Sequence, residues 1–114
     1  MKPDTVTGCL ELCLRERADK TWMRERDGDR WVDKTWRDAC EEIHAAAAWL
    51  EERYGALHSN VALLSKNRPR WVLADLAIIA SGNVSIPLFT TQTADTTKYI
   101  LEFTDARVLI LGES

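Results

Sequence analysis

Three short, continuous apolar runs constrain the fold of this chain more than any other feature of its sequence. They occupy residues 61–64, 84–88 and 108–111 and read VALL, VSIPL and VLIL. Each run is too short for a helix and is typical of a strand buried on both faces. Helical patterns at 69–81 and 93–104 separate them. Strands joined by helical crossovers are parallel and their connections right-handed, so the sequence predicts a three-layer α/β unit built on a βαβαβ half-sheet.

The first half of the chain is more strongly charged and predicts a solvated flank of helices and a hairpin. An amphipathic pattern predicts a helix over 5–17. Segments 21–26 and 30–34 flank Asp27-Gly28, and Asp-Gly between two such segments indicates a hairpin, which Trp22 and Trp31 are expected to anchor. A second helix is predicted from a cap at Thr35, with Asp38 in its first turn, to about Arg53, and Gly55 is expected to stop it.

We expect one hydrophobic core around the parallel sheet. Its predicted members are Trp71, Leu76, Ile79, Ile86, Leu88, Ile100 and Leu109. In the helix at 93–104, the residues expected to point inward are Ala94, Tyr99, Ile100 and Phe103. The cysteines, Cys9, Cys13 and Cys40, are interpreted as small core fillers, because their spacing to the two histidines matches no structural zinc site.

Length and composition exclude several classes of protein. The 114 residues suit a single domain, and the formal charge of −3 disfavours a nucleic-acid partner. No run approaches the roughly 18 apolar residues of a membrane-spanning helix. We therefore expect a soluble, cytoplasmic protein without a transmembrane segment.

Ligands of open α/β sheets bind beyond the carboxyl ends of the strands, which directs attention to residues 65–68, 89–92 and 112 onward. The first of these loops contains no glycine, so it does not resemble a dinucleotide-binding loop. Lys66 and Arg68 are interpreted as a solvated turn, with attraction of an anion as the alternative. Residues 89–92 are interpreted as a turn before a helix cap, with the polar lining of a ligand site as the alternative.

The remaining ionisable residues do not form a catalytic pattern. Asp75 lies within an apolar helix and is expected to make a structural hydrogen bond, although a functional carboxylate is the other interpretation. His44 falls on a polar helix face and His58 in a loop. Neither is spaced from an acid or a hydroxyl as a catalytic base would be.

Several of these segments together resemble a known family. They are Asp29-Arg30-Trp31 through Thr35-Trp36-Arg37-Asp38, the turn Asn67-Arg68-Pro69-Arg70-Trp71 after its apolar run, and Ser81-Gly82-Asn83-Val84-Ser85-Ile86-Pro87-Leu88-Phe89. Thr91-Gln92-Thr93-Ala94 and the run that ends at Leu111 add to the likeness. The combination resembles the N-terminal region of adenylate-forming (AMP-binding) enzymes, most closely the long-chain fatty-acid–CoA ligases.

The resemblance implies an enzyme that joins ATP and a carboxylate into an acyl-adenylate and then transfers the acyl group to the thiol of CoA, with Mg²⁺ assisting. In that family the phosphate loop, the adenine and magnesium segment and the lysine-bearing lid lie downstream, so no catalytic, cofactor-binding or metal-binding residue is assigned here. We expect residues 1–114 to be a single partial domain that is inactive alone. The alternatives are a self-standing α/β binding or regulatory module and the same segment of an aryl or medium-chain ligase.

The resemblance also implies the partners of the chain. These are the remainder of a ligase chain and, in the full-length enzyme only, a fatty acid. Bare sheet edges and uncovered apolar faces favour a homo-oligomer, with a dimer as the first expectation. A peripheral position at the inner face of the membrane is the other location considered beside the cytoplasm.

Overall fold

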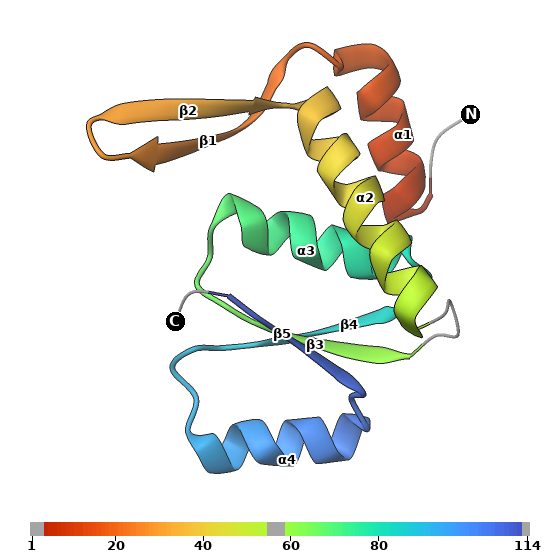
Figure 1. Cartoon of the computed structure of the whole chain (residues 1–114), viewed down its shortest axis with the longest axis vertical. Helices are drawn as coiled ribbons and strands as arrows, with labels where there is room; N and C mark the ends of the chain where they lie inside the picture. The colour runs from red at the N-terminus through yellow and green to blue at the C-terminus, as the bar shows by residue number, and fades with distance from the viewer. Residues whose placement is uncertain (1–3, 55–58, 113–114) are drawn as a thin grey trace.

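A computed structural model describes residues 4–54 and 59–112 of the chain. Within these residues a hairpin and a helical layer lie above a small sheet, and one further helix lies below it (Figure 1). The elements in chain order are α1 (Val6–Arg17), β1 (Thr21–Asp27), β2 (Arg30–Thr35), α2 (Trp36–Tyr54), β3 (Asn60–Leu64), α3 (Pro69–Ala80), β4 (Val84–Leu88), α4 (Ala94–Thr104) and β5 (Val108–Leu111).

The three apolar runs form the parallel sheet that the sequence predicts. Its strand order is β4-β3-β5, and both pairings are parallel. Because β3 pairs with both neighbours, it is the central strand, and Val61, Ala62 and Leu63 are buried. Helices α3 and α4 cover opposite faces, so the predicted three-layer βαβαβ unit is confirmed (Figure 1).

Local capping and turn residues explain where several elements begin and end. Thr35 Oγ1 accepts a hydrogen bond from the Asp38 N–H at 3.1 Å at the start of α2, as predicted. Thr5 and Thr93 accept equivalent bonds at the starts of α1 and α4. Gly28 has a φ of 64°, which the tight turn of the predicted hairpin requires. The predicted stop at Gly55 lies outside the described residues.

The β1–β2 hairpin is held differently at its two ends. At its base, Trp22 stacks on Trp36 of α2 with ring centroids 4.0 Å apart. Farther out, Trp31 is 59% exposed, and its ring contacts only the Arg26 guanidinium among the ring contacts described. Trp22 therefore anchors the hairpin as predicted, whereas the same expectation for Trp31 is wrong because the hairpin projects away from the helices (Figure 1).

The hydrophobic interior consists of two clusters rather than the single core predicted. The first joins α1, α2 and α3 and is formed by Leu10, Ala39, Cys40, Ile43, Leu73 and Ala77, with Leu76 packed against it. The second joins the sheet to α2 and α3 and is formed by Leu50, Val61, Leu63 and Ile78, with Trp71 packed against it. The two clusters lie on opposite faces of α3, so Leu76 packs against the first cluster and Trp71 against the second.

The other predicted core members are buried to different degrees. Leu88 is buried, Ile79, Ile86 and Ile100 are half-buried, and Leu109 is exposed. Ile86 and Leu109 belong to β4 and β5, which have a described partner strand on one side only. Their place at the edges of a narrow sheet explains the exposure.

The predicted inward face of α4 is right for Ile100, which is half-buried, and wrong for the other three residues. Tyr99 and Phe103 are 64% and 77% exposed and stack on each other with centroids 5.8 Å apart, and Ala94 is exposed as well. The other half-buried residues of this helix are Thr97, Leu101 and Thr104. Of two apolar stripes on α4, only the one with Ile100 and Leu101 faces the sheet.

The cysteines are only partly the core fillers that were expected. Cys40 is buried, Cys13 is half-buried and Cys9 is exposed on α1. Burial raises the pKa of the Cys40 thiol, and the neighbouring Cys13 raises it further. Among the described residues, no helix combines the length and the apolar character needed to cross a membrane.

Candidate functional site

The strand order creates a crevice at the carboxyl ends of β3 and β4. The loop after β3 leads to α3 on one face of the sheet, and the loop after β4 leads to α4 on the other face. Adjacent parallel strands whose loops diverge in this way define a topological switch point, the usual ligand position of an open α/β sheet. The structure therefore brings together the first two loops singled out in the sequence.

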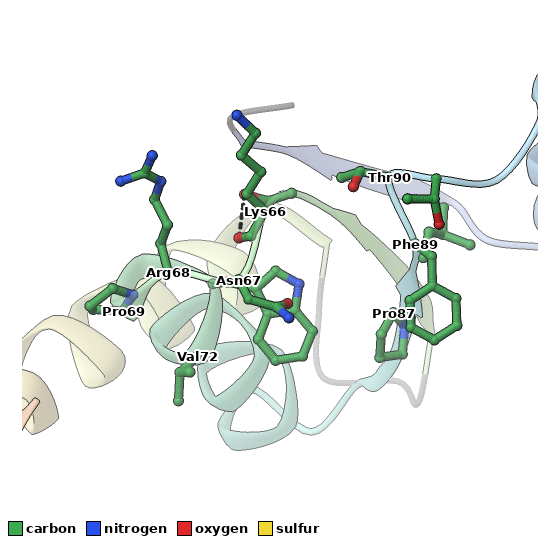
Figure 2. A pocket seen from close by; sticks show the side chains of 12 residues that line it. Lys66, Asn67, Arg68, Pro69, Val72, Pro87, Phe89 and Thr90 are labelled. Carbon is green, nitrogen blue, oxygen red and sulfur yellow. Dashed lines mark hydrogen bonds between the residues drawn. The ribbon is translucent and has the colours of Figure 1, made fainter. Parts of the chain in front are cut away.

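The crevice encloses about 750 Å³, within the usual range for a small-molecule pocket. One wall is the start of α3 with the loop before it, and the other is the end of β4 with the residues after it. The residues that line it are Ser65, Lys66, Asn67, Arg68, Pro69, Trp71, Val72, Pro87, Leu88, Phe89, Thr90 and Thr91. Figure 2 shows Asn67 on the α3 side facing the gap toward Pro87 and Phe89.

Local backbone chemistry shapes both walls. On one side Pro69 takes the first position of α3, where its missing N–H costs no helical hydrogen bond, and Arg68 before it is extended. On the other side the Phe89 N–H donates to Gln92 Oε1 at 3.1 Å, and the Gln92 N–H donates to the Phe89 carbonyl at 3.2 Å. This turn leaves Phe89 71% exposed at the crevice. The predicted turn and Thr93 cap are present, and the same segment also lines a pocket.

The outer edge of β4 offers no free N–H at Pro87 or Phe89, near the crevice. The Val84 N–H donates to the Ser59 carbonyl, so alternate residues from Val84 direct their backbone groups toward β3. Pro87 therefore lies at an outward-facing position, where it has no N–H to offer. The next outward N–H, that of Phe89, is already bonded to Gln92. An added strand would therefore find no N–H donor on this part of the edge.

The third predicted loop also reaches this end of the sheet. The Gly112 N–H donates to the Leu64 carbonyl at 3.0 Å, and Gly112 lies against Ser65. A second hollow of about 440 Å³ adjoins them and extends to the hairpin residues Glu25–Asp27. In it, Arg68 Nη1 lies 3.6 Å from Glu25 Oε1. Through this exposed ion pair the Arg68 guanidinium contacts the hairpin.

The other predicted polar residues lie away from the crevice. Ser85 Oγ donates to Asp75 Oδ1 at 2.5 Å and ties β4 to α3, so the structural interpretation of Asp75 is confirmed. His44 is exposed on α2, and His58 lies outside the described residues. The described residues contain no group of three His, Cys, Asp or Glu side chains that could hold a metal ion.

The sequence did not single out Trp71, Val72 and Pro87 as lining residues. Trp71 was assigned to the core, and it does pack against the sheet cluster while also reaching the crevice. The sequence position of Trp71 could have indicated this role. Trp71 lies in the first turn of the helix that starts at Arg68-Pro69, and that turn is near the carboxyl end of the sheet.

Comparison with solved structures defines the class of fold. The N-terminal subdomain of Klebsiella oxytoca NpsA matches with a TM-score of 0.83 at 21% identity, over 93% of this chain and 27% of that one. The anthranilate CoA ligase AuaEII matches with a TM-score of 0.76 at 27% identity, over 90% of this chain and 19% of that one. The fold is that of the N-terminal subdomain of adenylate-forming enzymes.

Sequence comparison then gives the family. The family model for the AMP-binding enzyme matches residues 10–114, and the chain belongs to that family. The long-chain-fatty-acid–CoA ligase FadD15 of Mycobacterium tuberculosis is 33% identical over 79 residues, which are 69% of this chain and 13% of that protein. The matched region is thus a small part of its relatives' length. The resemblance inferred from the sequence is confirmed, and the chain corresponds to the N-terminal region of an adenylate-forming ligase.

Proposed function

We propose that this chain is the N-terminal scaffold segment of an ATP-dependent long-chain fatty-acid–CoA ligase. The observation that carries the proposal is the 33% identity to FadD15, a long-chain-fatty-acid–CoA ligase. The likeness to an anthranilate CoA ligase supports an aryl acid as the alternative substrate. Both alternatives share one chemistry, the activation of a carboxylic acid.

The proposed substrates of the complete enzyme are ATP, a fatty acid and CoA, with Mg²⁺ as the metal. The carboxylate displaces pyrophosphate from ATP to give the acyl-adenylate, and the CoA thiol then displaces AMP to give the thioester. This segment supplies no group to either step. It contributes a buried central strand and the helices that hold the carboxyl edge of the sheet in place, and the rest of a ligase chain is its partner. We place this enzyme in the cytoplasm.

The proposal predicts that the 114-residue chain has no ligase activity, because its sequence contains no Ser/Thr/Gly-rich phosphate loop to stabilise the charge of the transferring phosphoryl group. Pyrophosphate release would be measured with ATP, Mg²⁺, palmitate and CoA. Turnover by protein purified free of host ligases would contradict the prediction.

A chimera tests the function itself. The matched 79-residue region of FadD15 would be replaced by its counterpart from this chain, with the same FadD15 region deleted as the control. We expect the chimera to form palmitoyl-CoA and the deletion variant to form none. A folded chimera that uses anthranilate but no fatty acid would favour the aryl ligase instead.

The second candidate function is a self-standing binding module, and the observation that favours it is the crevice. Under this alternative the isolated chain would be a monomer that binds a ligand. Sedimentation of the chain at several concentrations distinguishes the two, because a scaffold segment with uncovered apolar faces is expected to associate.

A further inference from the structure

We propose that Cys13 of α1 and Cys40 of α2 form a reversible disulfide through exchange with a small-molecule disulfide such as oxidised glutathione. The bond links α1 to α2 and closes a loop that contains the β1–β2 hairpin. Neither cysteine lines the crevice. The inference rests on how the two helices pack and is independent of the proposed ligase activity.

The packing of α1 on α2 brings the two cysteines to one interface. The helices lie side by side and share the first hydrophobic cluster (Figure 1). Cys40 belongs to that cluster together with Leu10 of α1, and Leu14 of α1 packs against it. Residues three apart share a face of a helix, so Cys13, three residues after Leu10, borders the same cluster. The half-buried state of Cys13 agrees with this position.

A second observation indicates that the two sulfurs are near each other. Burial raises the pKa of the Cys40 thiol, and the negative charge of a Cys13 thiolate raises it further. A like charge has such an effect only from a distance of a few ångströms. The electrostatic coupling therefore agrees with the placement that the helix faces give.

The accessibility of the two cysteines sets the order of reaction. Cys40 is only 1% exposed, so a dissolved reagent does not reach its sulfur, whereas half-buried Cys13 is partly accessible. Cys13 therefore reacts first, and Cys40 reacts with a sulfur that the fold already holds beside it. A hollow of about 420 Å³ between α1 and α2 borders Cys40 and gives its side chain room to turn.

Cys9 is a poorer partner for Cys13. The two residues are four apart on α1, and the Cβ atoms of such a pair are roughly 5–6 Å apart in a regular helix. A disulfide needs a Cβ separation of roughly 3.5–4.5 Å. A Cys9–Cys13 bond would therefore distort α1, whereas a bond from Cys13 to Cys40 leaves the helix regular.

The exchange consists of two displacements. The Cys13 thiolate attacks one sulfur of oxidised glutathione, the S–S bond of glutathione breaks, and one glutathione leaves as a thiol. The Cys40 thiolate then attacks the Cys13 sulfur of the mixed disulfide and releases the second glutathione. The protons of the two protein thiols pass to the two glutathione thiolates, and glutathione accepts the two electrons that the protein loses. Reduced glutathione reverses both steps, as is usual for disulfides in a reducing compartment.

The test is oxidation of the 114-residue chain in buffers of reduced and oxidised glutathione, without denaturant and in urea. After acid quenching, cleavage at Glu11 separates Cys9 from Cys13, so mass spectrometry identifies which cysteines are linked. We expect the Cys13–Cys40 link, with a ratio of oxidised to reduced chain at least about tenfold higher in the folded than in the unfolded state. By linkage, oxidation should lower the unfolding equilibrium constant by the same factor.

Matched variants assign a role to each thiol. Cys9→Ser should leave the link unchanged, and Cys13→Ser should abolish it and keep Cys40 reduced in the folded chain. Cys40→Ala should stop the reaction at the mixed disulfide of Cys13 with glutathione. Because Cys13 is only half-buried, Cys13→Ser gives a folded control even if the substitution at buried Cys40 disturbs the first cluster.

Several outcomes would overturn the inference. One is a chain with the native circular dichroism spectrum that forms no intramolecular disulfide in these buffers. Another is a link that includes Cys9, and a third is an equal extent of Cys13–Cys40 oxidation in the folded and unfolded chains, which would mean that the fold does not favour the bond. None of these results depends on whether the chimeric ligase is active.

Discussion

Replacing Gly112 by alanine should destabilise the fold because of one specific contact. A Cβ at Gly112 would lie 2.6 Å from Ser65 Cβ and closer still to Ser65 Oγ, distances that force a neighbour to move. The obstacle includes Ser65 Cβ, which cannot rotate away. The Gly112 N–H also holds the end of β5 to the Leu64 carbonyl, so displacement strains that bond. Overpacking of this kind costs about 1–3 kcal/mol.

The contact can be isolated by removing the other partner. In Ser65→Gly the nearest atom to the new Cβ would be Ser65 Cα at 3.8 Å, an ordinary van der Waals distance. Gly112→Ala in that background should therefore cost little, and the cycle should give a coupling of about 1–2 kcal/mol. Urea unfolding followed by tryptophan fluorescence measures all four free energies of unfolding.

Gly28→Ala is the control. Gly28 has open space around it and a φ of 64°, so an alanine there costs about 1 kcal/mol through backbone strain alone. Ser65→Gly should not reduce that cost. A Gly112→Ala loss below about 0.5 kcal/mol, or an equal loss in both backgrounds, would refute the steric argument.

Three further predictions concern packing, thiol chemistry and association. Leu63→Ala on central β3 should cost about 2–5 kcal/mol in urea unfolding, and half-buried Ile86→Ala on β4 should cost less than half as much; equal losses would contradict the edge position of β4. Iodoacetamide at neutral pH should label exposed Cys9 first and Cys40 only on unfolding, since burial raises the pKa of the Cys40 thiol and shields it; mass spectrometry that finds early Cys40 labelling would refute this. Sedimentation should show a dimer, and Leu111→Lys should make it dissociate more readily, because Leu111 is 68% exposed at the end of an edge strand. A variant that associates like the unmodified chain would show that the β5 edge is not the dimer interface.

The elements could be predicted because their signals are local. Each apolar run of four or five residues became a strand of the parallel sheet, and Thr35 and Asp27-Gly28 set a helix start and a hairpin turn through contacts within a few residues. The candidate loops could be predicted for a different reason. The rule that ligands lie at the carboxyl edge of a parallel sheet follows from topology alone, so knowing that β3 and β4 are parallel was sufficient to select residues 65–68 and 89–92.

The predictions that failed concern how the elements pack against each other. Helix α4 carries two apolar stripes, and the prediction combined Ile100 of the half-buried stripe with Tyr99 and Phe103 of the exposed one. The division of the interior into two clusters also escaped prediction, because α3 packs on α1 and α2 with one face and on the sheet with the other. Sequence periodicity shows that a helix has an apolar face but not which of several neighbours that face meets.

The chemistry of the crevice follows from the same strand order that defines the fold. With β3 in the centre and right-handed crossovers to both sides, α3 and α4 must cover opposite faces, so the two loops separate and leave a gap between them. Any sequence with this topology has such a gap, and the loop residues decide what it can hold. Here one loop is a turn without glycine, and Pro87 and Phe89 line the opposite wall. The topology therefore determines where a ligand can bind, and the side chains of the two loops determine which ligand fits there.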